Sequence, residues 1–114
     1  MNKEDLDFQR NVNSIYRELN EVFFSKDNDY ANSFYEVRKE FSTLFNAPSI
    51  ILLFNKFIRF RTLLIDKYNN SDEYNNGIDK LIEDALLDLA NYCVMEVAAM
   101  RIEKQINDCN NKLF

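Results

Sequence analysis

Histidine is absent from this chain, and glycine, proline and cysteine are scarce: its 114 residues include one glycine, one proline and two cysteines. The lack of histidine excludes the commonest zinc ligand, the commonest neutral-pH base and any catalytic triad that contains histidine. Because glycine and proline interrupt helices and form tight turns, their scarcity favours long helices joined by few turns.

The two cysteines, Cys93 and Cys109, lie 16 residues apart in a helical pattern. That spacing is about 24 Å along a continuous helix. A disulfide needs Cα atoms within about 7 Å, so these thiols do not bridge within one chain. We interpret both as reduced thiols of a cytosolic protein.

Long apolar runs are also missing. The N-terminal sequence MNKEDLDFQRN is charged and has no apolar signal core, and the longest fully apolar run, IILLF (50–54), is too short to cross a bilayer. We therefore expect no membrane partner and a cytoplasmic location. The abundance of asparagine, lysine and isoleucine is typical of AT-rich bacterial or phage genomes, and a phage protein would occupy the host cytoplasm.

The net charge of −5 argues against binding of a nucleic-acid polymer, which requires a basic surface. A local basic pocket for a small anionic ligand is compatible with that charge. With 114 residues, 46% of them hydrophobic, the chain has the size and composition of a single helical domain, residues 1–114.

Apolar residues recur at steps of three and four, which predicts an all-α fold with helices over about 4–25, 33–45, 48–68 and 78–112. The third helix and the middle of the fourth are apolar nearly all round, and one chain of this size cannot cover two such helices. We therefore expect an oligomeric four-helix bundle, either a homodimer or a homotetramer.

A polar stripe interrupts the apolar fourth helix. Asp84, Asp88 and Asn91 recur at i, i+4 and i+7 and therefore share one side. Because a lone buried carboxylate is costly, these acids must meet cations, a metal or water. The stripe is either a metal- or nucleotide-facing surface inside a bundle or a solvated strip of an amphipathic helix.

Glu36 and Glu40 form a second acidic pair at i, i+4. If the second and fourth helices lie together, this pair meets Asp84 and Asp88. Four such carboxylates suit a magnesium-type site that bridges phosphates and activates water. The alternative is a solvated face with Arg38 and Lys39 beside it.

Cations on the third helix and a polar loop complete the candidate ligand site. In NKFIRFR (55–61), Lys56 and Arg59 share a side among phenylalanines, where cations hold phosphate while a base stacks nearby. The alternative is a pair of charges that flank an aromatic core. In KDNDYANSF (26–34), polar side chains and Tyr30 are suited to line the mouth of a pocket.

The order of these segments resembles a known family. A K-x-N-D-Y-x-x-S-F loop, a K-x-x-R helix and a D-x-L-x-D-L-A-N-Y helix together resemble the small all-α family called nucleotide modification associated domain 1. That family is common in phages and is related to the MazG-like NTP pyrophosphatases. The matching residues, within about 20–100, are Lys26, Asn28, Asp29, Tyr30, Ser33, Phe34, Lys56, Arg59, Asp84, Leu86, Asp88, Leu89, Ala90, Asn91 and Tyr92.

The resemblance implies a MazG-like four-helix unit that forms dimers or tetramers, holds a nucleotide between helices and uses Mg²⁺ to hydrolyse it between the α and β phosphates. The chain departs from this pattern, because Val37 and Ala85 stand where MazG enzymes carry acids. Lys80 stands four residues before Asp84, where the related family is expected to have an acid. A lysine there would occupy the space of the cation or repel it. The scaffold and pocket therefore carry over better than the metal chemistry.

We therefore expect a phage-type protein that binds and sequesters a small nucleotide without turnover and without a cofactor. Its role would be anti-defence, as a sponge for a cyclic-nucleotide or related immune signal. The residues expected to bind the ligand are Lys26, Asp29, Tyr30, Ser33, Lys56, Arg59, Asp84, Asp88, Asn91 and Tyr92.

Two other functions are compatible with the sequence. One is a Mg²⁺-dependent nucleotide pyrophosphohydrolase, with the metal held by Glu36, Glu40, Asp84 and Asp88. The other is an interaction module whose apolar helices bind another protein.

Overall fold

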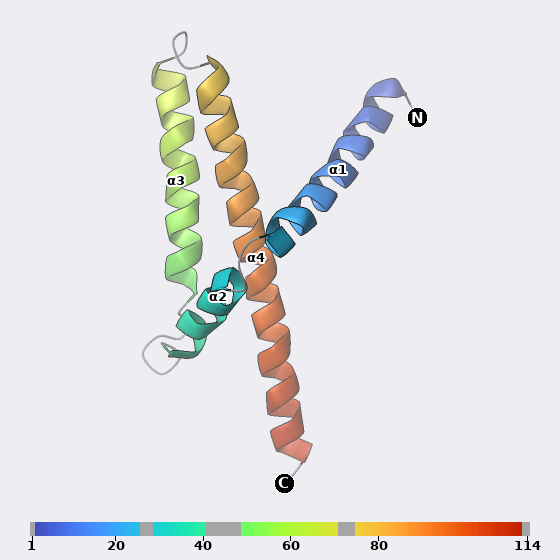
Figure 1. Cartoon of the computed structure of the whole chain (residues 1–114), viewed down its shortest axis with the longest axis vertical. Coiled ribbons are helices and arrows are strands. Elements are labelled where there is room, and N and C mark those ends of the chain that lie inside the picture. The colour runs from blue at the N-terminus through green and yellow to red at the C-terminus, as the bar shows by residue number, and fades with distance from the viewer. Residues whose placement is uncertain (1, 26–28, 41–48, 71–74, 113–114) are drawn as a thin grey trace. The chain divides into compact units, whose positions relative to one another are not determined.

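The chain forms four α-helices in a computed structural model that describes residues 2–25, 29–40, 49–70 and 75–112 (Figure 1). The helices are α1 (Lys3–Ser25), α2 (Asp29–Glu40), α3 (Ile50–Asn69) and α4 (Asn75–Lys112). No strand occurs within these four ranges, so the expected all-α fold is confirmed. The chain divides into two compact units, Met1–Tyr30 and Ala31–Phe114.

Two helices begin earlier than the sequence pattern predicts. α2 begins at Asp29 rather than near position 33, and α4 begins at Asn75 rather than near position 78. Both starts lie in polar stretches whose aspartate and asparagine residues also favour the start of a helix. The predicted end of the second helix near 45 and the predicted helix start at Pro48 lie outside the described residues. α3 begins at Ile50, directly after Ser49.

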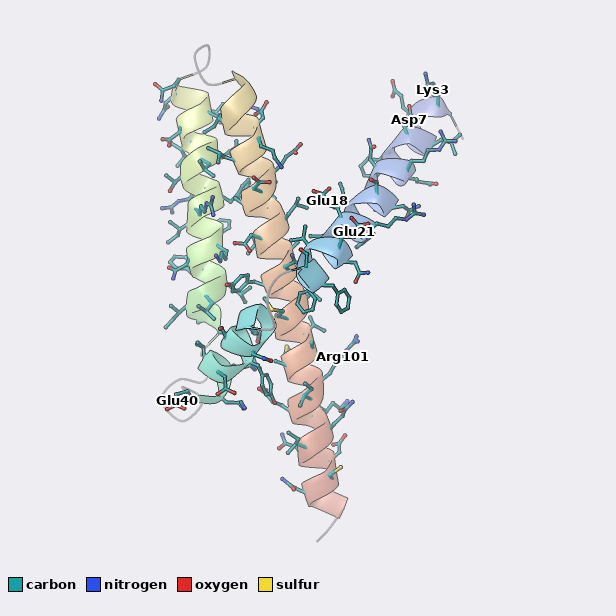
Figure 2. All side chains as sticks on the ribbon, in the orientation of Figure 1. Lys3, Asp7, Glu18, Glu21, Glu40 and Arg101 are labelled. Carbon is teal, nitrogen blue, oxygen red and sulfur yellow. The ribbon has the colours of Figure 1, made fainter. Side chains whose placement is uncertain are left out.

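The first unit contains α1, which has a well-capped N-terminus. The Asn2 side-chain oxygen accepts a hydrogen bond from the backbone N–H of Asp5 at 2.9 Å, which satisfies one of the free donors at the helix start. Figure 2 shows charged side chains spread along this helix, among them Lys3, Asp7, Glu18 and Glu21. No residue of α1 is buried, so its apolar residues contribute surface rather than core.

In the second unit, α3 and α4 lie side by side and antiparallel (Figure 1). Two ion pairs across the helices show their register. The Lys67 ammonium lies 2.6 Å from the Asp79 carboxylate near the C-terminal end of α3, and the Lys56 ammonium lies 2.9 Å from the Asp88 carboxylate further along α4. The predicted third and fourth helices are therefore antiparallel neighbours.

Among the described residues of the second unit, the apolar core is small and lies mainly on α4. The buried apolar residues are Phe34, Ile78, Ile82, Ala85, Met95 and Ala99. Ala85 and Ala99 are almost completely covered, and their short side chains allow a neighbouring segment to approach α4 closely. Because few apolar side chains are buried in the described part of this unit, polar contacts have a larger share in holding its helices against one another.

Several large apolar side chains stay uncovered in this unit. On α3, Ile50, Phe54, Phe57, Ile65 and Tyr68 retain between 44% and 78% of their surface. The described end of α4 beyond Ala99 is also exposed, apart from Glu103. These side chains form uncovered apolar surface on the described part of the unit.

Both cysteine thiols are free and exposed on α4, which confirms that Cys93 and Cys109 do not form a disulfide with each other. In the described part of the chain, no helix combines the length and the apolar character needed to cross a bilayer.

Candidate functional site

Three residues of α4, spaced one turn apart, contact the other two helices of the second unit. Asp88 contacts α3, Tyr92 contacts both α2 and α3, and Glu96 contacts α2. We call Asp88, Tyr92 and Glu96 the α4 row. Steps of four residues keep these side chains on adjacent turns of one side of the helix.

Lys56 of α3 contacts Asp88 and Tyr92, the first two residues of the α4 row. Its ammonium nitrogen is 2.9 Å from Asp88 Oδ2 and 4.9 Å from the centre of the Tyr92 ring. The side chains of Lys56 and Asp88 are only 28% and 19% exposed. Partial removal from water strengthens both the ion pair and the cation–π contact. The site is therefore a partly covered cation beside an aromatic ring and a carboxylate.

Phe34 of α2 also packs against the Tyr92 ring. The two rings meet edge to face, with centroids 5.6 Å apart and an angle of 78° between the ring planes. This is a favoured geometry for aromatic pairs. Phe34 is 4% exposed, so α2 supplies a buried wall to the Tyr92 ring while α3 supplies the cation.

Arg38, one turn after Phe34 on α2, joins three segments. Its Nε and Nη2 atoms donate to the two carboxylate oxygens of Glu103 at 2.5 and 2.9 Å. Its Nη1 atom donates to Glu96 Oε1 and, at 2.7 Å, to the hydroxyl of Ser49 at the start of α3. The Arg38 side chain is only 11% exposed. A guanidinium fork suits such a bidentate, multi-partner contact.

The charges of this cluster do not balance, because one arginine faces two glutamates. Hydrogen bonding to Glu103 raises the pKa of Arg38 above its usual value, against the opposing effect of burial, and Glu96 adds to the increase. The same hydrogen bonds lower the pKa of Glu103, again against the effect of burial. Glu96 Oε2 is buried and has no hydrogen-bond partner among the described residues. The cluster therefore depends on its single cation.

The predicted polar stripe runs from solvent into the helix interface. Asp84 is exposed and pairs with Lys80 of its own helix at 2.8 Å. Asp88 is half-buried against Lys56, and Asn91 is buried, with 5% of its surface exposed. The stripe is therefore neither fully solvated nor fully enclosed.

The other predicted ligand-binding residues are placed less closely together. Arg59 on α3 and Ser33 on α2 are exposed. Asp29 and Tyr30 form the first turn of α2, but their side chains lie outside the described part of the structure, and Lys26 lies outside it altogether. The structure therefore brings together Lys56, Asp88 and Tyr92 of the predicted set.

The four acids proposed to hold a metal are not gathered in this structure. In the described ranges, no three acidic or cysteine side chains form a group that could hold a metal ion. Glu40 lies at the C-terminal end of α2 (Figure 2), and Glu36 pairs with Lys39 of its own helix at 3.0 Å. Asp84 and Asp88 also have lysine partners, as described above.

Sequence reasoning missed the Arg38 cluster. The alternative of a solvated face for Glu36 and Glu40 is confirmed, since both residues are exposed and Glu36 pairs with the exposed Lys39. Arg38 is not part of that face, because its side chain is nearly covered. One available signal was the i, i+4 spacing of Phe34 and Arg38, which places both on one side of a helix. A second was the seven-residue spacing of Glu96 and Glu103, which repeats an acid on one side of a stretch that is apolar apart from Arg101.

Comparison of the chain with models of protein families, with curated proteins and with solved structures finds no match.

The Arg38 cluster predicts a specific pH dependence of stability. Because the pKa of Glu103 is lowered by folding, its interaction stabilises the fold above the unfolded carboxyl pKa of about 4.3 and is lost as pH falls through the lower folded value. Glu103→Gln should lower the free energy of unfolding by about 1 kcal/mol near neutral pH, a modest cost because this side chain is 46% exposed. Urea unfolding near neutral pH and well below the unfolded pKa measures the difference.

At the acidic pH, the free energy of unfolding of Glu103→Gln should lie closer to that of the unmodified chain than it does near neutral pH. Glu83→Gln, an exposed glutamate on the same helix, is the matched control and should show a smaller change. An equal deficit of Glu103→Gln at both pH values would show that its charge is not used in folding.

Proposed function

We propose that this protein binds a small nucleotide without turnover, at the surface where α3 and α4 meet. The observation that supports the proposal is the position of Lys56, whose ammonium group lies between the Asp88 carboxylate and the Tyr92 ring. A partly covered cation next to an aromatic ring offers charge for a phosphate and a surface for a base or sugar.

Binding would proceed by exchange of ionic partners. A phosphate oxygen replaces Asp88 beside Lys56, and the exposed Arg59, one turn further along α3, adds a second cation. Asp88 is then available to accept a hydrogen bond from a base N–H or a ribose hydroxyl. This exchange avoids leaving either buried charge without a partner.

The lysine partners of the candidate metal-binding acids support sequestration of a nucleotide over its hydrolysis. Glu36, Asp84 and Asp88 each lie within ion-pair distance of a lysine. Lys80 in particular occupies the surroundings of Asp84. A metal would have to displace these lysines before it could bridge phosphates. In this proposal the chain has a MazG-like scaffold whose pocket is kept and whose metal chemistry is not, and a phage would use it as a sponge for a nucleotide immune signal.

The proposal predicts that purified protein retains or acquires an intact nucleotide. Mass spectrometry of material released by heat denaturation identifies a bound nucleotide, and a panel of linear and cyclic nucleotides raises the melting temperature when a member binds. Lys56→Met should weaken the binding of the best panel member by about tenfold or more, equivalent to about 1.4 kcal/mol. Lys104→Met, which removes an exposed lysine of α4, is the control and should bind normally.

Two results would change this conclusion. If no nucleotide shifts the melting temperature, the binding function is wrong. If Mg²⁺-dependent release of a monophosphate and pyrophosphate accompanies binding, and Asp88→Asn abolishes it, the pyrophosphohydrolase alternative is correct instead.

We also propose that the exposed apolar stripe of α3 binds a second copy of the chain. Ile50, Phe54, Phe57, Ile65 and Tyr68 recur at steps of three and four around Arg61, the one charged residue of the stripe. If two copies of α3 pair antiparallel about an axis midway between positions 57 and 61, Arg61 faces the partner's Phe57. Two cation–π contacts then form by symmetry, whereas a parallel pair would set Arg61 against the partner's Arg61.

This arrangement predicts a homodimer, or a homotetramer built from it, that depends on Phe57. Phe57→Glu should weaken self-association by about tenfold or more, because it places a carboxylate in an apolar interface. Light scattering over a range of concentrations, compared with the 13.6 kDa of one chain, measures the effect. Thr62→Glu, an exposed position of α3 outside the stripe, should leave the assembly intact. A monomer at all concentrations would favour the interaction module instead.

A further inference from the structure

One arginine attaches α2 to the rest of its unit. Four hydrogen bonds extend from the Arg38 guanidinium group to Glu96 and Glu103 on α4 and to Ser49 before α3. α2 has 12 residues, and a helix of that length is only marginally stable by itself. Its conformation and its position therefore depend on this attachment and on Phe34.

We infer that Arg38 is a positioning residue for the Lys56–Asp88–Tyr92 site, acting through Phe34 and the Tyr92 ring. The part that concerns ligand affinity depends on the proposed function, whereas the structural part does not. The four hydrogen bonds of Arg38 go to Glu96, Glu103 and Ser49, and they fix the helix whose Phe34 packs against Tyr92.

The contacts along the α4 row explain how the effect is transmitted. Phe34 and Arg38 are one turn apart on α2, and their partners Tyr92 and Glu96 are one turn apart on α4. Two contacts at matching spacings fix both the position and the orientation of a short helix. Tyr92 in turn holds the ammonium group of Lys56 over its ring at 4.9 Å.

Electrostatics explains why loss of Arg38 would release α2. Without its cation, Glu96 would lose its partner at Oε1 and would already lack one at Oε2. Glu103, two turns further along α4, would also lose a bidentate partner. Uncompensated carboxylates must be hydrated, and water reaches Glu96 when α2 moves away. The Phe34 ring then leaves Tyr92.

A lysine cannot reproduce the attachment fully. Its ammonium group is a point charge, whereas the planar guanidinium of Arg38 reaches two carboxylates and the Ser49 hydroxyl at once. Arg38→Lys therefore separates the effect of charge from the effect of geometry. Phe34→Leu separates them in another way, since it keeps the charge cluster and removes the ring that contacts Tyr92.

The first experiment measures the chemical accessibility of Lys56 without any ligand. The full chain is treated briefly with an amine-acetylating reagent, and mass spectrometry gives the acetylation rate at each lysine. Arg38→Ala should raise the rate at Lys56 about fivefold through local opening of α2, with no change at Lys80 on the exposed side of α4. Phe34→Leu should also raise the rate at Lys56, and Arg38→Lys should give an intermediate rate.

The matched control is Lys39→Ala. It removes one positive charge from the same helix at the neighbouring position, where the side chain is 53% exposed and pairs with Glu36. Its Lys56 rate should equal that of the unmodified chain. A Lys56 rate that is unchanged in Arg38→Ala overturns the inference. If Arg38→Ala raises the acetylation rates of Lys56 and Lys80 together, the loss of structure is general and Arg38→Lys becomes the deciding variant. In Arg38→Lys, a higher acetylation rate at Lys56 alone supports the inference, and any other result overturns it.

The second experiment separates this inference from the proposed function. Equilibrium dialysis with each member of the panel of linear and cyclic nucleotides, used singly, is compared for the unmodified chain, Arg38→Lys and Lys39→Ala. About tenfold weaker binding in Arg38→Lys alone supports a positioning role. Equal binding by all three, with unchanged Lys56 acetylation, overturns that role and leaves nucleotide binding intact. If the unmodified chain binds no member of the panel and Lys56 is more reactive in Arg38→Lys, the result counts against nucleotide binding and supports the positioning role.

Discussion

Charged groups that are removed from water need partners, and along α4 this requirement determines what lies against the helix. Asp88 meets Lys56 of α3, and Glu96 meets Arg38 of α2. Along α4, Tyr92 lies between these two acids, and its ring contacts Phe34 of α2 and Lys56 of α3. Since few apolar side chains are buried in the described part of the unit, these directional contacts have a larger share in fixing its arrangement than they would in a well-filled core.

The same residues that hold the helices together are those with chemistry to offer a ligand. Lys56 is covered enough for its charge to be effective, and yet it retains 28% exposure for approach of an anion. In the proposed binding, a phosphate would replace Asp88 beside Lys56, and Asp88 would accept a hydrogen bond from the ligand instead. Structure and proposed function are therefore coupled, and a ligand at Lys56 would act on the same contacts that position α3.

The periodicity of the sequence was sufficient to predict the helices but not their mutual contacts. Repeats at three and four residues correctly indicated an all-α chain of four helices, and the unbridged cysteines followed from helix length. The polar stripe was visible because Asp84, Asp88 and Asn91 share a side of one helix. Their differing exposure was not predictable, because it depends on where α3 and α2 cover α4.

Arg38 shows the same limit more sharply. A cation beside Glu36 and Glu40 in the sequence suggests local pairing, whereas its actual partners are 58 and 65 residues away. Helical spacing identifies which residues of α2 share a side, but only the packing of α2 on α4 selects Glu96 and Glu103 as partners. No family model, curated protein or solved structure supports the resemblance to a MazG-like family, so its implications for topology, site residues and ligand remain part of the proposal.

The central claim is that the Tyr92 ring contacts Phe34 of α2 and Lys56 of α3 at the same time. Nuclear Overhauser spectroscopy on the full chain tests it directly, with phenylalanine, tyrosine and lysine selectively labelled. The account predicts contacts from the Tyr92 ring protons both to the Phe34 ring and to the terminal methylene of Lys56, consistent with ring centroids 5.6 Å apart and an ammonium nitrogen 4.9 Å from the ring centre. A Tyr92 ring that shows contacts only within α4 would contradict it.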